Sequence, residues 1–262
     1  MRITTISTSD NSVLISVVMS VHNFDRYPIP GIETTLEQTY TDFEFIVVDD
    51  GSNYETKESL YKYASSDNRI KLLTNEKNLK LASSLNRGIR EAKGKYIARA
   101  DVNIEYHQSR LQKQIDFLEN HPEIDVVGSN FLWATEGKVK QRYIKLPEKN
   151  KEIIKKLSRA NCICHPSVMY RKERLIKYGP YKEGFGKPED YHLWMKTRKD
   201  LQFYNMQQSL LLKWHRANPW NDRLFEYFIN DFKLRIMGIK TSPNPIIDIL
   251  FLPKCLNYFF HF

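Results

Sequence analysis

With 262 residues, of which 41% are hydrophobic and 13% aromatic, the chain is long enough to bury a core and too apolar to be disordered. Its 40 basic and 31 acidic side chains leave a formal charge of +9, which favours anionic partners, although a solvated basic surface is the simpler explanation. The three cysteines give no disulfide framework, and neither a signal-peptide pattern nor roughly 18 successive apolar residues are found. We therefore expect a cytoplasmic protein.

Strands and helices alternate in the first part of the chain. Apolar runs predict strands at 14–20, 43–49, 70–73 and 95–99. Helical patterns predict helices at 31–38, 56–64 and 81–92. This alternation is typical of a parallel sheet covered by helices, an α/β architecture of the Rossmann-like kind.

The pattern changes beyond Asp101. It predicts further helices at 108–119, 149–158 and 172–178, a helix that starts at Glu189, and strands at 125–129 and 167–170. The glycines and proline of 184–188 predict a mobile loop before that last helix. No repeat and no linker rich in glycine and serine interrupts the chain, so we expect one compact domain at 1–215 with two halves, 14–105 and 106–215.

A helical and aromatic tail is expected at 216–262. Its last part, 243–262, is apolar but is interrupted by Asp248, Pro253 and Lys254, and is too short to span a bilayer. It suits either a peripheral contact with a membrane interface or docking on the domain or on a second subunit. The sequence leaves these alternatives, and the oligomeric state, open.

Acidic residues follow two of the predicted strands. Asp49 and Asp50 end one strand, and Asp101 follows another. Open α/β sheets bind ligands beyond the carboxyl ends of their strands, where acids can meet a nucleotide and a divalent cation. Taken alone, each group has a plainer explanation: Asp49-Asp50-Gly51-Ser52 suits a turn, and Glu189-Asp190 suits the start of a helix.

Six segments in sequence order resemble family 2 glycosyltransferases. They are 16–23, 47–52, 75–89, 92–101, 165–169 and 189–194. The resemblance extends over roughly 15–214, and its strength lies in the order of the segments, since a site needs several groups together. It implies a GT-A fold and the transfer of a sugar from a nucleotide-sugar, usually with inversion at the anomeric carbon.

The resemblance also implies residue roles. Asp190 resembles the general base that deprotonates the acceptor hydroxyl, with Glu189 beside it. Asp101 and Asn103 stand where the family places its metal-binding D-x-D motif, which implies Mn²⁺ or Mg²⁺. The positions that match the nucleotide site are Ser20, His22, Asn23, Asp49, Asp50, Arg87 and Asp101.

Some positions depart from the family pattern. Ser20 replaces the usual proline, and Asn103 replaces the second acid, so we expect the divalent cation to bind weakly. Arg87 and Arg99 either face phosphate or pair with acidic side chains, and His165 is either a core residue or an acceptor-side residue. The sequence does not decide between these alternatives.

Three functional hypotheses follow. The leading one is an inverting glycosyltransferase that uses a UDP-sugar and a glycan or lipid-linked acceptor for surface polysaccharide, such as lipopolysaccharide, at the inner face of the cytoplasmic membrane. A sugar hydroxyl needs a base to take its proton, and the leaving diphosphate needs positive charge. The alternative is a non-catalytic or degenerate GT-A-like nucleotide-binding protein. Nucleic acid is not expected as a partner, because no recognised binding motif accompanies the basic charge.

Overall fold

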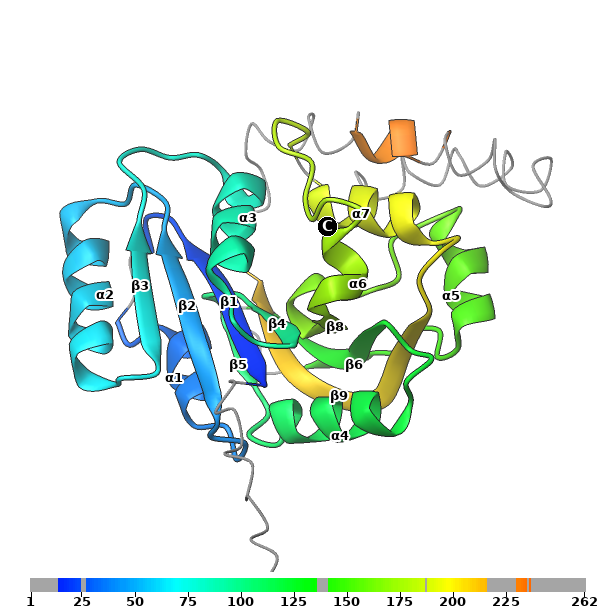
Figure 1. The fold of residues 1–262 in the computed structure, drawn as a ribbon, viewed down its shortest axis with the longest axis horizontal. Helices are drawn as coiled ribbons and strands as arrows, with labels where there is room; N and C mark the ends of the chain where they lie inside the picture. Colours follow the sequence, from blue (N-terminus) through cyan, green and yellow to red (C-terminus); the bar gives the residue numbers. More distant parts are fainter. Residues whose placement is uncertain are drawn as a thin grey trace, which may run out of the picture.

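One nine-stranded sheet organises the part of the chain that the structure describes (Figure 1). The structure is a computed structural model that describes residues 14–24, 27–135, 141–186, 188–215, 230–234 and 236. The strand order is β3-β2-β1-β4-β8-β6-β9-β5, and β7 pairs with β6. The strands are β1 (Ile15–Val21), β2 (Phe43–Asp49), β3 (Ile70–Thr74), β4 (Tyr96–Ala100), β5 (Ile104–Tyr106), β6 (Val126–Thr135), β7 (Arg142–Ile144), β8 (Met169–Arg171) and β9 (Phe203–His215).

The first four strands of the sheet run parallel to one another. β1 pairs with β2 on one side and with β4 on the other, and β3 extends the sheet beyond β2. The second part is mixed, because β8 runs antiparallel to both β4 and β6 while β6 and β9 are parallel. The predicted alternation of strands and helices through residue 100 is therefore confirmed.

Helices cover both faces of the sheet. They are α1 (Pro30–Leu36), α2 (Tyr54–Ser66), α3 (Leu81–Glu91), α4 (Arg110–Asn120), α5 (Asn150–Leu157), α6 (Lys172–Ile176) and α7 (Glu189–Thr197), with a 3₁₀ turn η1 at His165–Ser167. Successive side chains of β1 point to opposite faces, so Val17 and Met19 enter one core and Val18 enters the other. The first core includes side chains of α1, α2 and α4, and the second includes those of α3, α5, α6 and α7. Burial on both faces explains why these strands read as continuous apolar runs.

The start of α1 lies against the loop that follows β4. The backbone N–H of Gly31 donates to the carbonyl of Val102 at 3.0 Å. A Cβ atom on Gly31 would lie 1.9 Å from the carbonyl oxygen of Asp101, so only glycine fits this approach. The Asp101 loop is thus held by a helix that starts 70 residues earlier in the chain.

Strands β5, β7 and β9 were not predicted. The longest, β9, contains Asn205, Gln207 and Gln208, which obscure the alternation expected of a strand. Asn205 is fully buried because its amide donates to the carbonyls of Pro147 and Cys162 at 2.8 and 3.2 Å. Tertiary hydrogen bonds thus allow a polar residue in a buried strand.

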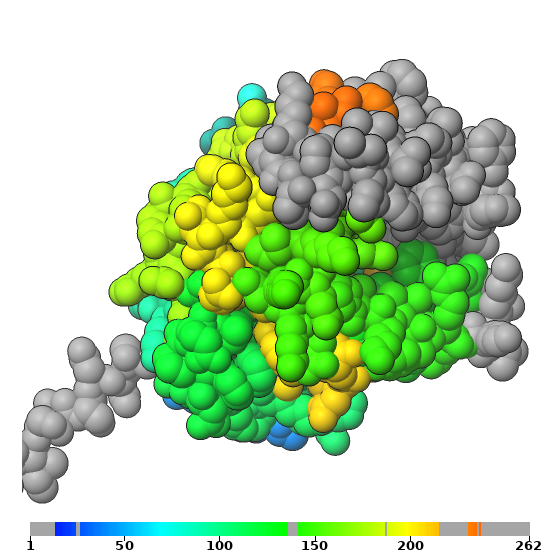
Figure 2. Space-filling view, turned by 90° about the vertical axis from the view of Figure 1, so that its right-hand side faces the viewer, coloured from blue at the N-terminus to red at the C-terminus, as the bar shows by residue number. Residues whose placement is uncertain are grey.

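Seen from the side of α5, the green stretch of the chain around α4 and α5 forms much of the coloured surface, and a yellow area near residue 200 lies beside it at the upper left (Figure 2). None of the described helices has the length and apolar character needed to cross a membrane. Most of the predicted tail, including the proposed contact region 243–262, lies outside the described residues. The same holds for Lys187 of the predicted mobile loop.

Candidate active site

The acids that follow β2 and β4 lie at one edge of the sheet. Val21 of β1 pairs with Asp49 of β2, and Met19 of β1 pairs with Ala100 of β4. Asp101 therefore leaves the sheet at the level where β1 and β2 also end. The arrowheads of β2 and β3 point to the upper side of Figure 1, which is also the side of α7. The expectation that the strand-end acids gather at one edge is met.

Asp49 has one carboxylate oxygen that accepts no hydrogen bond from the described residues. Its side chain is buried, and Oδ1 accepts a hydrogen bond from the backbone N–H of Ser52 at 2.9 Å. Oδ2 is buried as well and has no hydrogen-bond partner within the described part of the chain. A buried charged oxygen without a donor is costly, so this arrangement suits a ligand that brings its own donor.

Asp50 fixes the neighbouring loop. Its Oδ1 accepts from the side-chain amide of Asn75 at 2.9 Å and from the backbone N–H of Leu79 at 2.7 Å. Asn75 also donates to the hydroxyl of Ser84 at 2.9 Å, near the start of α3. Arg87 donates to the Thr74 carbonyl at 2.7 Å and to the side chain of Asn75. Within the described part of the chain, Arg87 thus bonds to a carbonyl and an amide rather than to an acidic side chain, and its contact with phosphate stays a prediction.

The loop after β1 is tied to the loop after β2. The ring nitrogen Nδ1 of His22 donates to the carbonyl of Asp50 at 2.9 Å. Asn23, at a positive φ of 48°, accepts from the backbone N–H of Asn53 at 2.8 Å. Ser20 is half-buried and lies beside Val48 in the sheet. These bonds bring Ser20, His22 and Asn23 to the same corner as Asp49.

Arg99 and Asp101 form an ion pair at the end of β4. The guanidinium of Arg99 is only 2% exposed, and its Nη2 donates to Oδ1 of Asp101, whose side chain is 29% exposed. Burial alone would raise the pKa of Asp101, but the charge of Arg99 prevails and holds that pKa below its usual value. Of the alternatives left open by the sequence, Arg99 thus takes the acid pair, and it keeps Asp101 ionised.

Asp190 stands at the start of α7 with an environment of its own. It is half-buried, and its Oδ2 accepts from the side-chain amide of Asn161 at 2.8 Å. Burial raises the pKa of Asp190, while the hydrogen bonds from the Tyr191 backbone and from Asn161 act in the opposite direction. A carboxylate with a raised pKa is a better proton acceptor than a solvated one.

Glu189 points to a different partner. It is 6% exposed, and its Oε1 lies 3.8 Å from Nδ1 of His165. The other ring nitrogen of His165 lies 2.7 Å from the hydroxyl of Tyr181. Burial and then the charge of Arg99 hold the pKa of His165 well below its usual value, so the ring is neutral near pH 7. His165 is therefore a satisfied core residue.

The two halves of the site are joined by Asn86 of α3. Its amide donates to the Tyr181 carbonyl at 2.9 Å and to Glu183 at 3.1 Å, and its Oδ1 accepts from the Tyr181 backbone at 2.9 Å. The segment that leads into α7 is thereby held against α3, the helix beside the loop that Asp50 fixes. No local sequence signal marks Asn86, because its partners lie about 95 residues away in the chain.

Lys213 and Asn161 are further site residues that the sequence did not indicate. Lys213 lies on β9, in register with Ile104 of β5 and Trp133 of β6, and its ammonium lies 5.4 Å from the centre of the Trp133 ring. The residue was missed because β9 was not predicted. Asn161 was missed because it lies in a loop without regular structure.

The loop from Asp101 to Asn103 offers few ligands for a divalent cation. The side-chain amide of the exposed Asn103 donates to the Trp214 carbonyl at 3.3 Å, which leaves its Oδ1 as a neutral ligand. Among the described residues, no group of three or more histidine, cysteine or acidic side chains could hold a metal. One ion-paired carboxylate and one amide oxygen fit a weak cation site whose other ligands come from a diphosphate and water.

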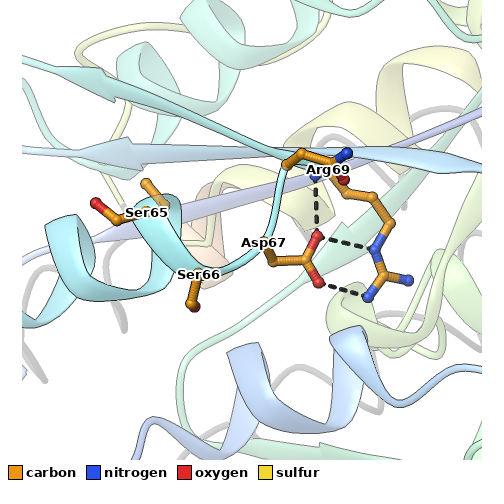
Figure 3. A pocket seen from close by; sticks show the side chains of 6 residues that line it. Ser65, Ser66, Asp67 and Arg69 are labelled. Atoms are coloured by element: carbon orange, nitrogen blue, oxygen red, sulfur yellow. Dashed lines mark hydrogen bonds and ion pairs between the residues drawn. The ribbon is translucent and has the colours of Figure 1, made fainter.

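A separate hollow lies at the opposite edge of the sheet, before β3 (Figure 3). Its volume is about 520 Å³, and residues 64–69 line it. The guanidinium of Arg69 donates to Asp67 at 3.0 and 2.7 Å, and the Arg69 backbone N–H donates to the same carboxylate at 2.9 Å (Figure 3). Because β3 runs parallel to β2, this hollow lies at the amino ends of the strands, away from Asp49 and Asp101.

Asp49 and Asp50 are expected to differ in their effect on stability. Asp50→Ala removes the acceptor of two donors, so the free energy of unfolding should fall by about 2 kcal/mol. Asp49→Asn retains the bond from Ser52 and removes a buried charge that has one free oxygen, so stability should stay equal or rise. Urea denaturation of both variants tests this difference. A similar loss in the two variants would make Asp49 a structural acid.

Comparison with known proteins gives a consistent result. The family model described as Glycosyl transferase family 2 matches residues 16–179. The O-antigen biosynthesis glycosyltransferase WbnJ of Escherichia coli is 32% identical over 243 residues, which cover 91% of this chain and 94% of that protein.

Two solved structures share the fold. S. aureus TarS 1-349 in complex with UDP-GlcNAc matches with a TM-score of 0.70 and 20% identity over 95% of this chain and 73% of that chain. The mannosyltransferase PcManGT from Pyrobaculum calidifontis, in complex with GDP-Man and Mn²⁺, matches with a TM-score of 0.61 and 14% identity over 93% and 73% of the two chains. The predicted GT-A fold, a single α/β domain with a mostly parallel sheet, is confirmed.

Membership in an enzyme family decides against the non-catalytic alternative. The family model covers more than half of the chain, and WbnJ, which matches 91% of it, is itself a glycosyltransferase. The chain belongs to glycosyl transferase family 2 and is a glycosyltransferase.

Proposed function

We propose that this enzyme transfers a sugar from a UDP-sugar to a hydroxyl of a glycan or lipid-linked acceptor in surface polysaccharide synthesis, with inversion. One observation carries the proposal: at the start of α7, Asp190 accepts a hydrogen bond from the Asn161 amide at 2.8 Å, and burial raises its pKa. Both Asp190 and Asp101 act on the pKa of the buried Cys164, which supports a common site. The UDP-GlcNAc bound by TarS and the O-antigen role named for WbnJ support the donor and acceptor classes.

The nucleotide of the donor binds at the corner formed by Asp49 and by the loop of Ser20, His22 and Asn23. Oδ2 of Asp49 accepts a hydrogen bond from the base, which gives this buried oxygen the donor that it lacks. Ser20, His22 and Asn23 border the nucleoside, and Asp50 and Arg87 hold the loop and helix that enclose it. Asp101, kept ionised by Arg99, faces the ribose and the diphosphate.

The chemical step is a single displacement. The acceptor hydroxyl attacks the anomeric carbon while Asp190 takes its proton, so the new C–O bond forms as the bond to the diphosphate oxygen breaks. The electron pair of the broken bond stays on the diphosphate. Attack from the side opposite the leaving group inverts the anomeric configuration. Glu189 precedes this base at the start of α7, where its buried side chain lies near His165.

A divalent cation is proposed as a weakly held partner. Asp101 and Asn103 would hold Mn²⁺ or Mg²⁺, which would supply positive charge to the diphosphate. The Mn²⁺ in the PcManGT complex supports this assignment, and the substitution of an amide for the second acid supports weak affinity.

Asp190→Asn is expected to abolish transfer. Because the amide cannot accept the proton, UDP release from a panel of UDP-sugars should fall by about 100-fold or more, with water or added oligosaccharides as acceptor. UDP affinity should change by less than about twofold, since the base does not hold the nucleotide. The exposed Asp200→Asn is the matched control. Full activity of Asp190→Asn would remove this residue as the base.

Asn161→Ala should shift the pH dependence of the same reaction. The base works only when it is ionised, so kcat/KM falls as the pH drops through the pKa of Asp190, which burial raises above the usual value of an aspartate. Loss of the hydrogen bond from Asn161 disfavours the carboxylate and raises that pKa further, so the acidic limb should move to higher pH. The exposed Asn68→Ala should leave the profile unchanged. An unshifted limb in Asn161→Ala contradicts the assignment.

The proposed location is the inner face of the cytoplasmic membrane, with contact through 243–262. The apolar and aromatic composition of this segment supports the proposal. A variant that ends at residue 242 should leave the membrane fraction after cell lysis, while the full-length chain remains partly bound. Equal partitioning of the two proteins would contradict membrane contact through this segment.

A further inference from the structure

Lys213 is a half-buried cation without an acidic partner among the described residues. Its backbone pairs with Ile104 of β5, the residue directly after Asn103. Its ammonium rests over the ring of Trp133, a contact that orients a cation without neutralising it. A lysine that the fold holds in place but leaves unpaired is available to an anionic ligand.

The position of Lys213 relative to the Asp101 loop is fixed by its neighbour Trp214. The indole of Trp214 donates to Glu105 of β5 at 2.5 Å. The backbone N–H of Trp214 donates to the carbonyl of Asn103 at 3.4 Å, and the Asn103 amide donates back to the Trp214 carbonyl at 3.3 Å. Strand β9 therefore cannot move away from the loop without breaking these bonds.

The charge of Lys213 reaches both proposed working carboxylates. After burial and Arg99, Lys213 is a further cause that lowers the pKa of Asp101. At Asp190, where burial raises the pKa, Lys213 acts in the opposite direction. Lys213 is also in register with Ile104, the residue after Asn103, so its charge acts from the side of the Asp101 loop, beside which the leaving diphosphate stands in the proposed function.

The balance of charge beside the Asp101 loop favours an anion once the proton has been transferred. The negative charge of Asp101 is already compensated by Arg99, and Asn103 brings none. With Lys213 and an ionised Asp190 added, the four groups are neutral before transfer. Once Asp190 has taken the proton of the acceptor hydroxyl, Arg99, Asp101 and Lys213 carry one net positive charge, which attracts the diphosphate as it leaves.

We propose that Lys213 binds the diphosphate of the donor and stabilises the leaving nucleoside diphosphate, so that the site depends more on this lysine than on a metal. The proposal rests on the proposed function. As the bond from the anomeric carbon to the β-phosphate oxygen breaks, that oxygen keeps the electron pair and accepts a hydrogen bond from the ammonium. The proton of the acceptor hydroxyl passes to Asp190 and not to the leaving oxygen.

Calorimetric titration of UDP and UMP tests the proposal on the full chain, once with Mn²⁺ and once with a chelator. For the native enzyme, we expect the chelator to weaken UDP binding by less than about threefold, because Lys213 supplies the charge. For Lys213→Met, UDP binding with chelator should weaken by about tenfold or more, while UMP binding changes little. Lys213→Arg should retain most of the UDP affinity. Lys62→Met, at an exposed position on α2, is the matched control.

A second variant tests the exchange of lysine for metal. Lys213→Met combined with Asn103→Asp replaces a cation by an acid beside Asp101, so UDP binding should become dependent on Mn²⁺. Thermal unfolding of each variant confirms that it is folded, and Lys213→Arg serves as the readout if Lys213→Met does not fold.

The outcomes separate the two proposals. Native-like UDP binding by Lys213→Met, an equal loss of UDP and UMP, or a native enzyme that binds UDP only with Mn²⁺ would overturn the role of Lys213 and leave the proposed function standing. Absence of both UDP and UMP binding in the native enzyme would instead overturn the proposed donor, and the Lys213 proposal with it.

Discussion

The parallel register of β1 between β2 and β4 determines where the acids of the site lie. Since all three strands run in one direction, each delivers the residue after its last pair to the same edge. The two cores on either side of the sheet keep this register, because a slip by one residue would exchange the side chains that face them. The position of the acids at this edge of the sheet therefore depends on the packing of the two cores.

Burial then gives three acids three different properties. Asp101 forms an ion pair with a buried arginine and stays ionised, whereas Asp190 accepts hydrogen bonds from amides and, because of its burial, holds its proton more tightly. Asp49 keeps an oxygen without a donor among the described residues, a cost in stability that the proposed contact with the nucleotide base would remove. Similar carboxyl groups are thus assigned to different tasks by solvent and neighbours rather than by their own chemistry.

The sequence predicted the parts of the fold that depend on local pattern. The strands through Ala100 could be predicted because burial on both faces leaves an uninterrupted apolar run. Asp49, Asp101 and Asp190 were predicted as site residues because the order of their segments resembles the family. Strand β9 could not be predicted from the sequence, because its buried Asn205 is tolerated only through hydrogen bonds to carbonyls that are distant in the chain. Lys213 and Asn161 were hidden for the same reason, since what makes each of them relevant is a neighbour far away in the chain.

The close approach of Gly31 to the Asp101 carbonyl has a consequence for how inactive variants are interpreted. A single methyl group at position 31 would occupy the place of that carbonyl and force the loop, with its carboxylate, out of position. All the proposed catalytic side chains would still be present in such a variant. A screen that measures activity alone would therefore count Gly31 of α1 among the catalytic residues. The absence of a side chain at Gly31 is therefore as necessary for the position of Asp101 as the ion pair with Arg99.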